Sequence, residues 1–436
     1  MKLSKSALFV LAAFAAAPTL AADLLDAYRS ALGQDAAFAS ARASQQAGQE
    51  KKSQGRSLLM PNVNLTASTT FNDTSSQYAG KSVDNQYNSN GYGISLVQPL
   101  FRQQTWLSYS ESEMQVAISE AQYKQAENDL ILRVAQSYFD VLIAQDGVQL
   151  AVAQKQAISE QLEQAKRNFE VGTSTITDTY EAQARYDLIN SQEITAQSNL
   201  EVKRRTLQQI TNSAPGELRQ LGKEFKLEAP QPADVEKWVA DAQQNNVQIT
   251  VAEAVAELAD KEVSRNFGGH LPTLDLVANY GKSSTVAVGI GAVESTSKSV
   301  GLQFNMPLFQ GGATQSKYRE AEAGRDKAKQ DLENARRTVA VQTRQAYLGV
   351  VNGIAQVQAL QQALKSSESL LEASKLGQGV GVRTNLDVLN AQQQLFSTRR
   401  DLYQAAYSYL LSRLRLKAAV GTLSEEDVGS VNQALR

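Results

Sequence analysis

The side chains that usually carry covalent or metal chemistry are almost absent from this sequence. Its 436 residues include no cysteine and a single histidine, His270. There is also no glycine-rich phosphate-binding fingerprint and no cluster with metal-ligand spacing. His270 precedes Pro272 at the start of an expected strand, so we expect a structural role for it. We therefore expect a protein that is not an enzyme and that holds no metal and no cofactor.

Two aspartates, Asp178 and Asp387, stand out because they lie 209 residues apart in matching contexts. Gly172 and Gly381 precede them at the same separation. A glycine followed by Ser or Thr commonly ends one helix and begins the next. We therefore expect two long helical hairpins that reverse at 171–178 and 377–384. An aspartate near a helix start is more often a cap or a partner of the helix dipole than a functional group.

Similar separations recur along the whole chain and predict a tandem duplication. The matching pairs are Tyr138 and Tyr347, Pro99 and Pro307, and Pro61 and Pro272, which lie 209, 208 and 211 residues apart. We expect a first repeat over 22–212 and a second over 247–421. An equatorial region over 213–246 is expected between them, with a C-terminal equatorial segment over 422–436.

Each repeat contains an alternating segment that predicts a β-hairpin, at about 62–98 and about 273–306. Asn62 to Phe71 alternates strictly between apolar and polar residues. The polar stretch from Asn72 to Asn90 is expected to be a loop, and a Gly/Ser/Thr loop is expected in the second hairpin. Such strands fit the wall of a transmembrane barrel, although the pattern alone fits ordinary half-buried hairpins as well.

The expected helices are too long for a globular domain. Gln103 to Phe169 would extend roughly 100 Å and Gln315 to Leu376 roughly 93 Å, at about 1.5 Å per residue. Four strands cannot close a barrel, and lipid does not tolerate unpaired strand edges. Several copies must therefore share one barrel. Three would supply twelve strands and twelve helical columns, and counting alone does not exclude two.

The N-terminus predicts export. Lys2 and Lys5 precede an apolar run, and small residues follow, so residues 1–21 are expected to be a signal peptide. No other run approaches the roughly 18 apolar residues of a membrane-spanning helix. The net charge of -2 indicates no nucleic-acid partner. The mature chain is expected to be periplasmic or an outer-membrane barrel.

Several separated motifs resemble the TolC family of outer-membrane efflux and type I secretion proteins. They are the segment from His270 to Leu276, the Pro-Leu-Phe segments at 99 and 307, Gly311-Gly312, Ile176-Thr177-Asp178, Val382-Arg383-Thr384 followed by Asp387-Val388-Leu389, and the segment from Ala418 to Leu423. The resemblance covers essentially the whole mature chain. It implies a mixed α and transmembrane β fold with an internally duplicated protomer. Three protomers would form a 12-stranded β-barrel in the outer membrane, continuous with a 12-helix periplasmic α-barrel.

The resemblance also implies site residues at the periplasmic tip. The closing polar links match Thr177, Asp178 and Arg383, and a tyrosine of that network matches Gln378. The aperture carboxylates match Asp387 and position 390, which is Asn390 here, so this aperture should carry fewer negative charges. We expect Arg383 to bridge toward Thr177 and Asp178 of a neighbouring hairpin. Adaptor docking is expected at the two turns, at Gly172, Thr173, Gly381 and Val382.

The function implied is the exit duct of a tripartite efflux pump or type I secretion system, gated at its tip. The cargo would be small molecules or unfolded proteins. Expected partners are two further copies of the chain, a periplasmic adaptor (membrane fusion) protein, an inner-membrane ABC or proton-driven (RND-type) transporter, and outer-membrane lipid. The alternative is a trimeric coiled-coil surface protein of the adhesin type, which would need the long helices but no amphipathic strands.

Overall fold

The computed structural model describes residues 23–435 apart from 79, 223–224 and 288–290. The expected signal peptide, residues 1–21, lies outside the described residues. The contacts within the chain divide it into two compact units. Unit 1 comprises the residues up to Ser40, Ala126–Asn246 and Ala340–Arg436, and unit 2 comprises Ala41–Gln125 and Val247–Val339. Each unit therefore contains matching parts of both halves of the duplicated sequence.

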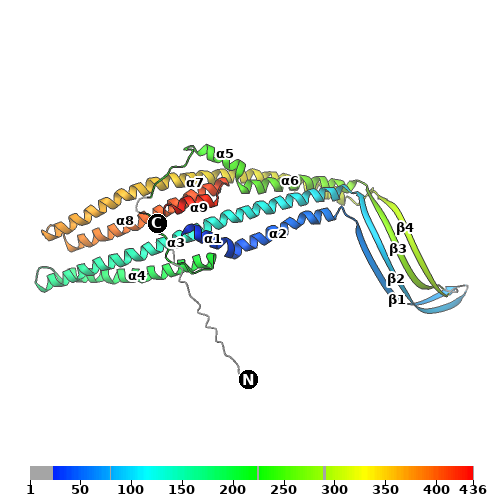
Figure 1. The fold of residues 1–436 in the computed structure, drawn as a ribbon, viewed down its shortest axis with the longest axis horizontal. Helices are drawn as coiled ribbons and strands as arrows, with labels where there is room; N and C mark the ends of the chain where they lie inside the picture. The colour runs from blue at the N-terminus through cyan, green and yellow to red at the C-terminus, as the bar shows by residue number, and fades with distance from the viewer. Residues whose placement is uncertain (1–22, 79, 223–224, 288–290, 436) are drawn as a thin grey trace, which may run out of the picture. The chain divides into compact units, whose positions relative to one another are not determined.

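Helices dominate the described chain (Figure 1). They are α1 (Leu24–Gln34), α2 (Ala36–Ser57), α3 (Gln103–Glu170), α4 (Ile176–Thr211), α5 (Val235–Asn245), α6 (Val247–Phe267), the 3-10 turn η1 (Gly268–His270), α7 (Ala313–Gly379), α8 (Asn385–Val420) and α9 (Glu425–Asn432). The two longest, α3 and α7, have 68 and 67 residues. In the part of the chain that the structure describes, no helix is long and apolar enough to cross a membrane.

The four described strands form one antiparallel sheet in unit 2, in the order β1-β2-β3-β4 (Figure 1). They are β1 (Asn62–Tyr78), β2 (Lys81–Phe101), β3 (Thr273–Ala287) and β4 (Gly291–Asn305). The loops expected at 72–90 and in the second hairpin are wrong, because these stretches continue the strands. Their polar side chains bond across the ladder, as Asn72 Nδ2 donates to Ser89 Oγ at 2.9 Å and Gln86 Nε2 to Asp73 Oδ2 at 3.1 Å. Cross-strand bonds of this kind stabilise a strand that has no apolar face.

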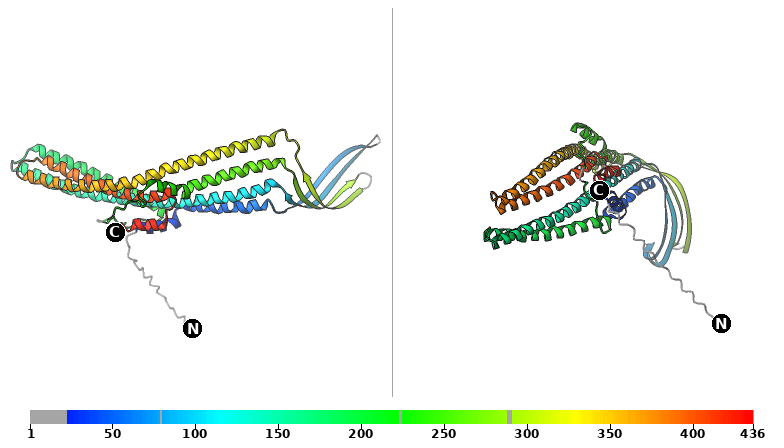
Figure 2. Two further views of the ribbon diagram at one scale, coloured as in Figure 1. Left: turned by 90° about the horizontal axis from the view of Figure 1, so that it is seen from above. Right: turned by 60° about the vertical axis from the view of Figure 1, so that its left-hand side comes forward.

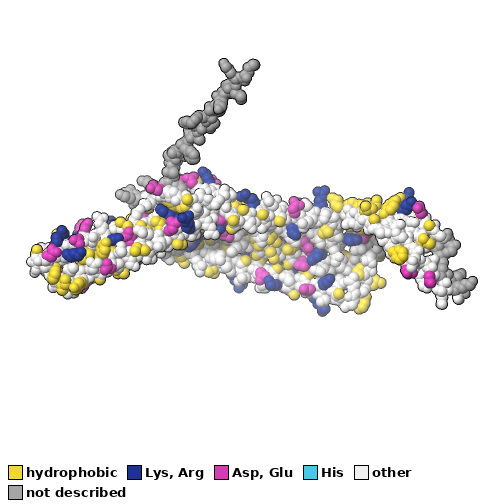
Figure 3. All heavy atoms as spheres, turned by 90° about the horizontal axis from the view of Figure 1, so that it is seen from below, with side chains coloured by type: hydrophobic (Ala, Val, Ile, Leu, Met, Phe, Trp, Pro, Cys, Tyr) yellow, Lys and Arg dark blue, Asp and Glu magenta, His cyan; other side chains and the backbone are white. Residues whose placement is uncertain are grey.

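The part of the sheet near the helices of unit 2 has one apolar and one polar face. Residues that oppose each other in neighbouring strands lie on the same face. One such row contains Val63, Leu96, Ala278 and Val300, and the adjacent row contains Asn64, Ser95, Asn279 and Ser299. Several apolar side chains are largely exposed, including Leu65 at 72% and Val300 at 76%. Figure 3 shows hydrophobic side chains gathered over the strand segments next to the helices, and mostly polar surface farther along the strands.

Close helix packing in unit 2 depends on small residues at heptad spacing. Gly48 and Gly55 on α2 face Ser119 and Ser112 on α3. A Cβ atom at Gly55 would lie 2.1 Å from Ser112 Oγ, and one at Gly48 would lie 2.3 Å from Ser119 Oγ. The pairs are seven residues apart on both helices, which is the repeat of a coiled-coil seam. The two helices therefore approach each other at points where only hydrogen fits.

Unit 1 consists of two helical hairpins and the segments that cover their bases. α3 lies beside α4, and α7 lies beside α8 (Figure 2). Tyrosines tie the segment between α4 and α5 to these helices: Tyr138 Oη donates to the carbonyl of Arg219 at 3.2 Å, and Tyr409 Oη to that of Glu228 at 3.0 Å. The core of unit 1 is therefore aromatic where this segment meets α3 and α8. At the end of α8, a Cβ at Gly421 would lie 2.2 Å from the carbonyl oxygen of Asn245, so the ends of α8 and α5 approach closely.

One buried carboxylate belongs to this core. Asp146 on α3 is 8% exposed and accepts a 3.0 Å hydrogen bond from Tyr407 Oη on α8. The ring of Tyr407 stacks on Phe139, with ring centres 5.7 Å apart. Burial raises the pKa of Asp146 to about 6, and the bond from Tyr407 only partly offsets that effect. Burial also raises the pKa of Tyr407, so the phenol remains protonated and donates.

Candidate gate at the turns of the two helical hairpins

The α3–α4 and α7–α8 turns have the same backbone geometry. Gly172 and Gly381 adopt φ angles of 76° and 79°, which glycine reaches without steric cost. The next residue closes each helix with the same bond: Thr173 N donates to Asn168 O at 2.8 Å, and Val382 N to Gly377 O at 2.9 Å. These bonds satisfy carbonyls at the end of each incoming helix. The two turns that the sequence duplication predicts therefore have the same conformation.

Both aspartates of the candidate gate cap the returning helices. Thr175 N donates to Asp178 Oδ2, and Thr384 N to Asp387 Oδ2, each at 2.9 Å. In return, Asp178 N and Asp387 N donate to the two threonine hydroxyls at 3.3 and 3.2 Å. These are reciprocal capping boxes. The backbone bond from Thr384, its hydroxyl, and the charge of Arg383 hold the pKa of Asp387 below its usual value, so Asp387 carries its negative charge at neutral pH.

Arg383 lies beside its own helix start. Its Nη1 atom is 3.8 Å from Asp387 Oδ1, and its side chain crosses Gly377, where an added Cβ would lie 2.7 Å from Arg383 Cγ. Among the described residues, Arg383 forms its ion pair with Asp387, whereas Asp178 bonds to Thr175. The expected bridge from Arg383 to Thr177 and Asp178 of a neighbouring hairpin is not tested by one copy and stays a prediction.

The two positions that depart from the family pattern are Gln378 and Asn390. Gln378 bonds to an amide side chain, and Asn390 bonds to a guanidinium group. Gln378 Nε2 donates to Asn385 Oδ1 at 3.3 Å, across the α7–α8 turn. Asn390 Oδ1 accepts a 2.6 Å bond from Nη2 of Arg185, which comes from α4. The structure therefore connects Asn390, one of the expected aperture positions, to the other hairpin. Arg185 lies outside the motifs that carry the family resemblance, and its counterpart 209 residues later is the neutral Gln394.

The surfaces of both turns are apolar and exposed. Val171 is 72% exposed, Val380 and Val382 are each 76% exposed, and Leu376 is 75% exposed. Val382 is itself one of the positions at which adaptor docking is expected, and Val171, Val380 and Leu376 lie near the others, Gly172, Thr173 and Gly381. Exposed apolar groups collected at one site commonly mark a protein contact.

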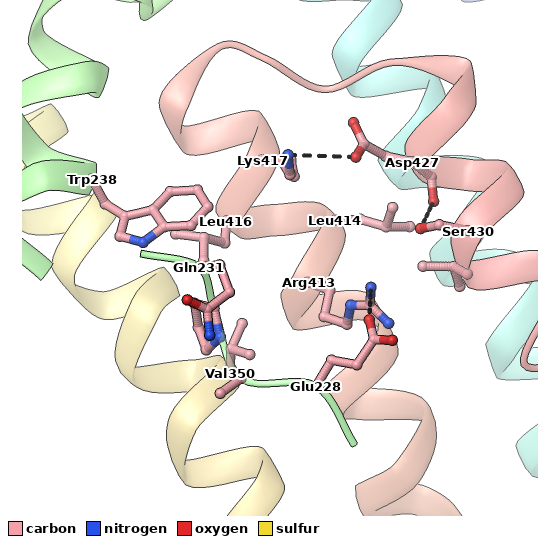
Figure 4. A pocket seen from close by; sticks show the side chains of 13 residues that line it. Glu228, Gln231, Trp238, Val350, Arg413, Leu414, Leu416, Lys417, Asp427 and Ser430 are labelled. Carbon is pink, nitrogen blue, oxygen red and sulfur yellow. Dashed lines mark hydrogen bonds and ion pairs between the residues drawn. The ribbon is translucent and has the colours of Figure 1, made fainter. Parts of the chain in front are cut away.

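A hollow of about 250 Å³ lies at the base of α8 in unit 1 (Figure 4). Trp238, Val350 and Leu414 contribute apolar walls. The charged groups at this hollow pair with one another, Arg413 with Glu228 at 2.9 Å and Lys417 with Asp427 at 3.7 Å. Within the described ranges there is also no group of three acidic or histidine side chains that could hold a metal ion.

Comparison with known proteins gives matches over nearly the whole chain. The model of the family described as Outer membrane efflux protein matches residues 27–213 and 238–422. The outer membrane protein TolC of Vibrio cholerae is 36% identical over 420 residues, covering 95% of this chain and 94% of that protein. The alkaline protease secretion protein AprF of Pseudomonas aeruginosa is 32% identical and covers 93% of this chain and 85% of that protein. The two matched stretches fall on the two halves of the duplication.

Solved structures share the fold. The CmeC outer membrane channel of Campylobacter jejuni superimposes with a TM-score of 0.79 at 18% identity, covering 95% of this chain and 90% of that one. CusC gives a TM-score of 0.78 at 17% identity over 92% of each chain. The mixed α and β fold expected from the sequence is confirmed. The family match over both halves, the identity with TolC of Vibrio cholerae and this shared fold establish that the chain is an outer-membrane protein of the TolC family.

Proposed function

We propose that three copies of this chain form the outer-membrane exit duct of an efflux pump or type I secretion system. The observation that carries the proposal is the sheet of unit 2. Its β1 and β4 are the two edges of the described sheet, and its rows alternate between an apolar and a polar face. A sheet of this kind suits a barrel wall with lipid outside and water inside. Lipid does not tolerate open edges, so other copies must cover them.

Three copies would join twelve strands into one barrel and twelve helical columns into a periplasmic tunnel. The number agrees with the TolC-family assembly that the sequence motifs imply. With three copies, the internal duplication places two equivalent hairpins from each chain in a ring of six. We propose that the two hairpin turns of each chain together form the constricted periplasmic tip.

We propose that Asp387, Asn390, Thr177, Asp178, Arg383 and Gln378 belong to the gate at this tip. Asp387 supplies a fixed negative charge, and Arg383 lies 3.8 Å from it. Ion pairs this exposed contribute little each, because water and salt screen them. Three copies of each contact would nevertheless open or close together, so small changes in one chain are multiplied at the tip.

We propose that the partners are a periplasmic adaptor protein and, through it, an inner-membrane ABC or proton-driven (RND-type) transporter. The exposed Val171, Val380 and Val382 beside the turns offer an apolar docking surface for the adaptor. The cargo class follows that of the transporter, either small molecules or unfolded proteins. Among the relatives, AprF is named for alkaline protease secretion and ArpC of Pseudomonas putida for antibiotic efflux.

The alternative of a coiled-coil adhesin finds no support. An adhesin rod would leave the four-stranded sheet without a role, and the relatives are named as outer-membrane, efflux and secretion proteins. Their names describe channels and secretion components, so we assign no catalytic step to the chain.

The charge at the tip provides the test of this function. Purified protein in planar bilayers is expected to form channels. Asp387→Asn is expected to lower the cation-to-anion permeability ratio by about twofold or more, because it removes three carboxylates from a narrow constriction. Asp178→Asn is the matched control, since it alters the same capping box on the other hairpin. Because the family resemblance assigns Asp178 to the links between hairpins and Asp387 to the aperture, this variant is expected to raise conductance without that change in selectivity. If both variants keep the wild-type selectivity, the turns are not the constriction.

A further inference from the structure

A single arginine fastens one helical hairpin to the other near the tip. Arg185 on α4 donates from Nη1 to Gln393 Oε1 at 2.8 Å and from Nη2 to Asn390 Oδ1 at 2.6 Å. Both acceptors are on α8 and three residues apart, so they lie on one face of that helix. The planar guanidinium can bind both at once because its donors form a rigid fork. A shift of α4 relative to α8 therefore breaks two hydrogen bonds.

Apolar packing next to this contact holds the same helices together. Ile189 on α4 and Leu389 on α8 are each 2% exposed and belong to one cluster with Ala151 and Ile158 of α3. Arg185 precedes Ile189 by one helical turn on α4, and Asn390 follows Leu389 directly. The arginine contact thus lies at the margin of a packed seam. The side chains that it joins are polar and reachable by water, so they can separate without opening the apolar cluster.

The same contact changes the charge beside Asp387. Asn390 follows Asp387 by three residues on α8, a rise of about 4.5 Å, and shares its face. Arg185 is bonded to Asn390, and Arg383 is 3.8 Å from Asp387. This face of α8 therefore has one carboxylate with a guanidinium on either side along the helix. A carboxylate at position 390 would instead have added a second negative charge.

We propose that Arg185 determines both the closure and the charge selectivity of the tip. It fastens α4 to α8 within each chain, and its positive charge opposes the field of Asp387. Anionic cargo therefore meets a weaker barrier here than at an aperture with two rings of carboxylates. The proposal rests on the proposed function, in which the hairpin turns form the constriction of a channel.

Two variants of Arg185 separate the link from the charge. Arg185→Ala removes both the link and the charge. Loss of the link is expected to raise single-channel conductance. Removal of three positive charges from the constriction is expected to increase the cation-to-anion permeability ratio by about twofold or more. Arg185→Gln removes the charge but retains an amide donor. It is expected to shift selectivity in the same direction with a smaller rise in conductance. Arg205→Gln is the matched control, since Arg205 on the same helix bonds to Glu201 and Gln208 of α4 and not to α8. It should behave as wild type.

A reducible cross-link tests the link independently of charge. The chain contains no cysteine, so Arg185→Cys combined with Gln393→Cys introduces the only thiol pair, at two positions that long side chains bridge in the wild type. A bis-methanethiosulfonate reagent long enough to replace those side chains is expected to join the two thiols within one chain, seen as loss of both free thiols without a cross-linked dimer, and to lower conductance until a reductant is added. If the cross-link forms and conductance is the same before and after reduction, the link does not control closure.

The outcomes distinguish this inference from the proposed function. If both Arg185 variants match Arg205→Gln in conductance and selectivity while Asp387→Asn still lowers cation selectivity, the inference is wrong and the channel assignment stands. If Asp387→Asn also has no effect, the tip is not the constriction and both fail. A shift of the Arg185 variants toward anion selectivity would contradict the proposed role of its charge.

Discussion

Cells that express the Leu96→Arg variant are expected to contain almost no assembled protein in the outer membrane. Leu96 lies on the central strand β2, with Val63 and Ala278 opposite it on the same apolar face. An arginine on the lipid face of a barrel costs about 2–4 kcal/mol near the midplane. Three copies multiply this cost within one assembly, which exceeds what a marginal barrel tolerates.

The neighbouring Ser95→Arg variant is the matched control. Ser95 lies between Asn64 and Asn279 on the opposite, polar face, where a charged side chain can be hydrated. It is expected to assemble at close to the wild-type level. The measurement is the amount of folded oligomer in outer-membrane fractions, resolved on gels without boiling. Equal losses in both variants would show that the two faces of the sheet do not differ in environment.

Replacing Asp146 by asparagine is expected to stabilise the protein above pH 6. The pKa of Asp146 in the folded chain is about 6, against an ordinary value of 3.8. The folded state therefore holds this proton more tightly than the unfolded state does, and stability falls as the pH rises from about 4 to about 6. Above that range the cost of the buried charge is constant, with an upper estimate of about 3 kcal/mol. The amide of the variant still accepts the bond from Tyr407.

Thermal unfolding in detergent between pH 4 and pH 8 measures this effect. Asp146→Asn should melt at a higher temperature than wild type at pH 7.5, and the difference should shrink toward pH 4. Asp140→Asn serves as the control on the same helix, because Asp140 accepts a 2.8 Å bond from Lys203 and loses an ion pair when neutralised. It should not be stabilised. A pH-independent difference, or a lower melting temperature for Asp146→Asn at pH 7.5, would contradict the buried charge.

Local sequence signals predicted the elements that depend on local chemistry. The glycines at 172 and 381 mark turns because each adopts a positive φ angle, and the Thr-x-x-Asp pattern from Thr384 to Asp387 forms a capping box. Long helical periodicity predicted α3 and α7 to within a few residues of their observed ends. Strand lengths were underestimated, because the polar half of each hairpin is held by cross-strand bonds such as that of Asn72 to Ser89. Hydrophobic alternation carries no signal there.

Contacts between distant elements could not be predicted in this way. Arg185 and Asn390 are 205 residues apart, and Asp146 and Tyr407 are 261 apart. Nothing in the spacing of either pair indicates that one helix presents its side chain to the other. The sequence did point to the aspartates of the turns. Arg185, which connects the α3–α4 hairpin to Asn390, is identified only by the structure.

The internal duplication specifies how one copy should pair with the next. Within the chain, Ser95 of β2 lies opposite Asn279 of β3. Residues of β4 follow their β2 counterparts by 208 positions, as Pro307 follows Pro99, and residues of β1 precede their β3 counterparts by 211, as Pro61 precedes Pro272. Gln303 of one copy should therefore oppose Ser68 of the next, both on the polar face of the sheet.

A disulfide between these two positions tests the central claim, which is that three copies close one barrel. The variant with Ser68→Cys and Gln303→Cys, in a chain that otherwise contains no cysteine, is oxidised in outer-membrane fractions and resolved on denaturing gels. Cross-linked bands should appear at two and three times the mass of one chain, with none larger, and should disappear on reduction. The single variants should give at most random pairs. A ladder beyond three copies, or a product that stops at two, would contradict the shared barrel of three chains.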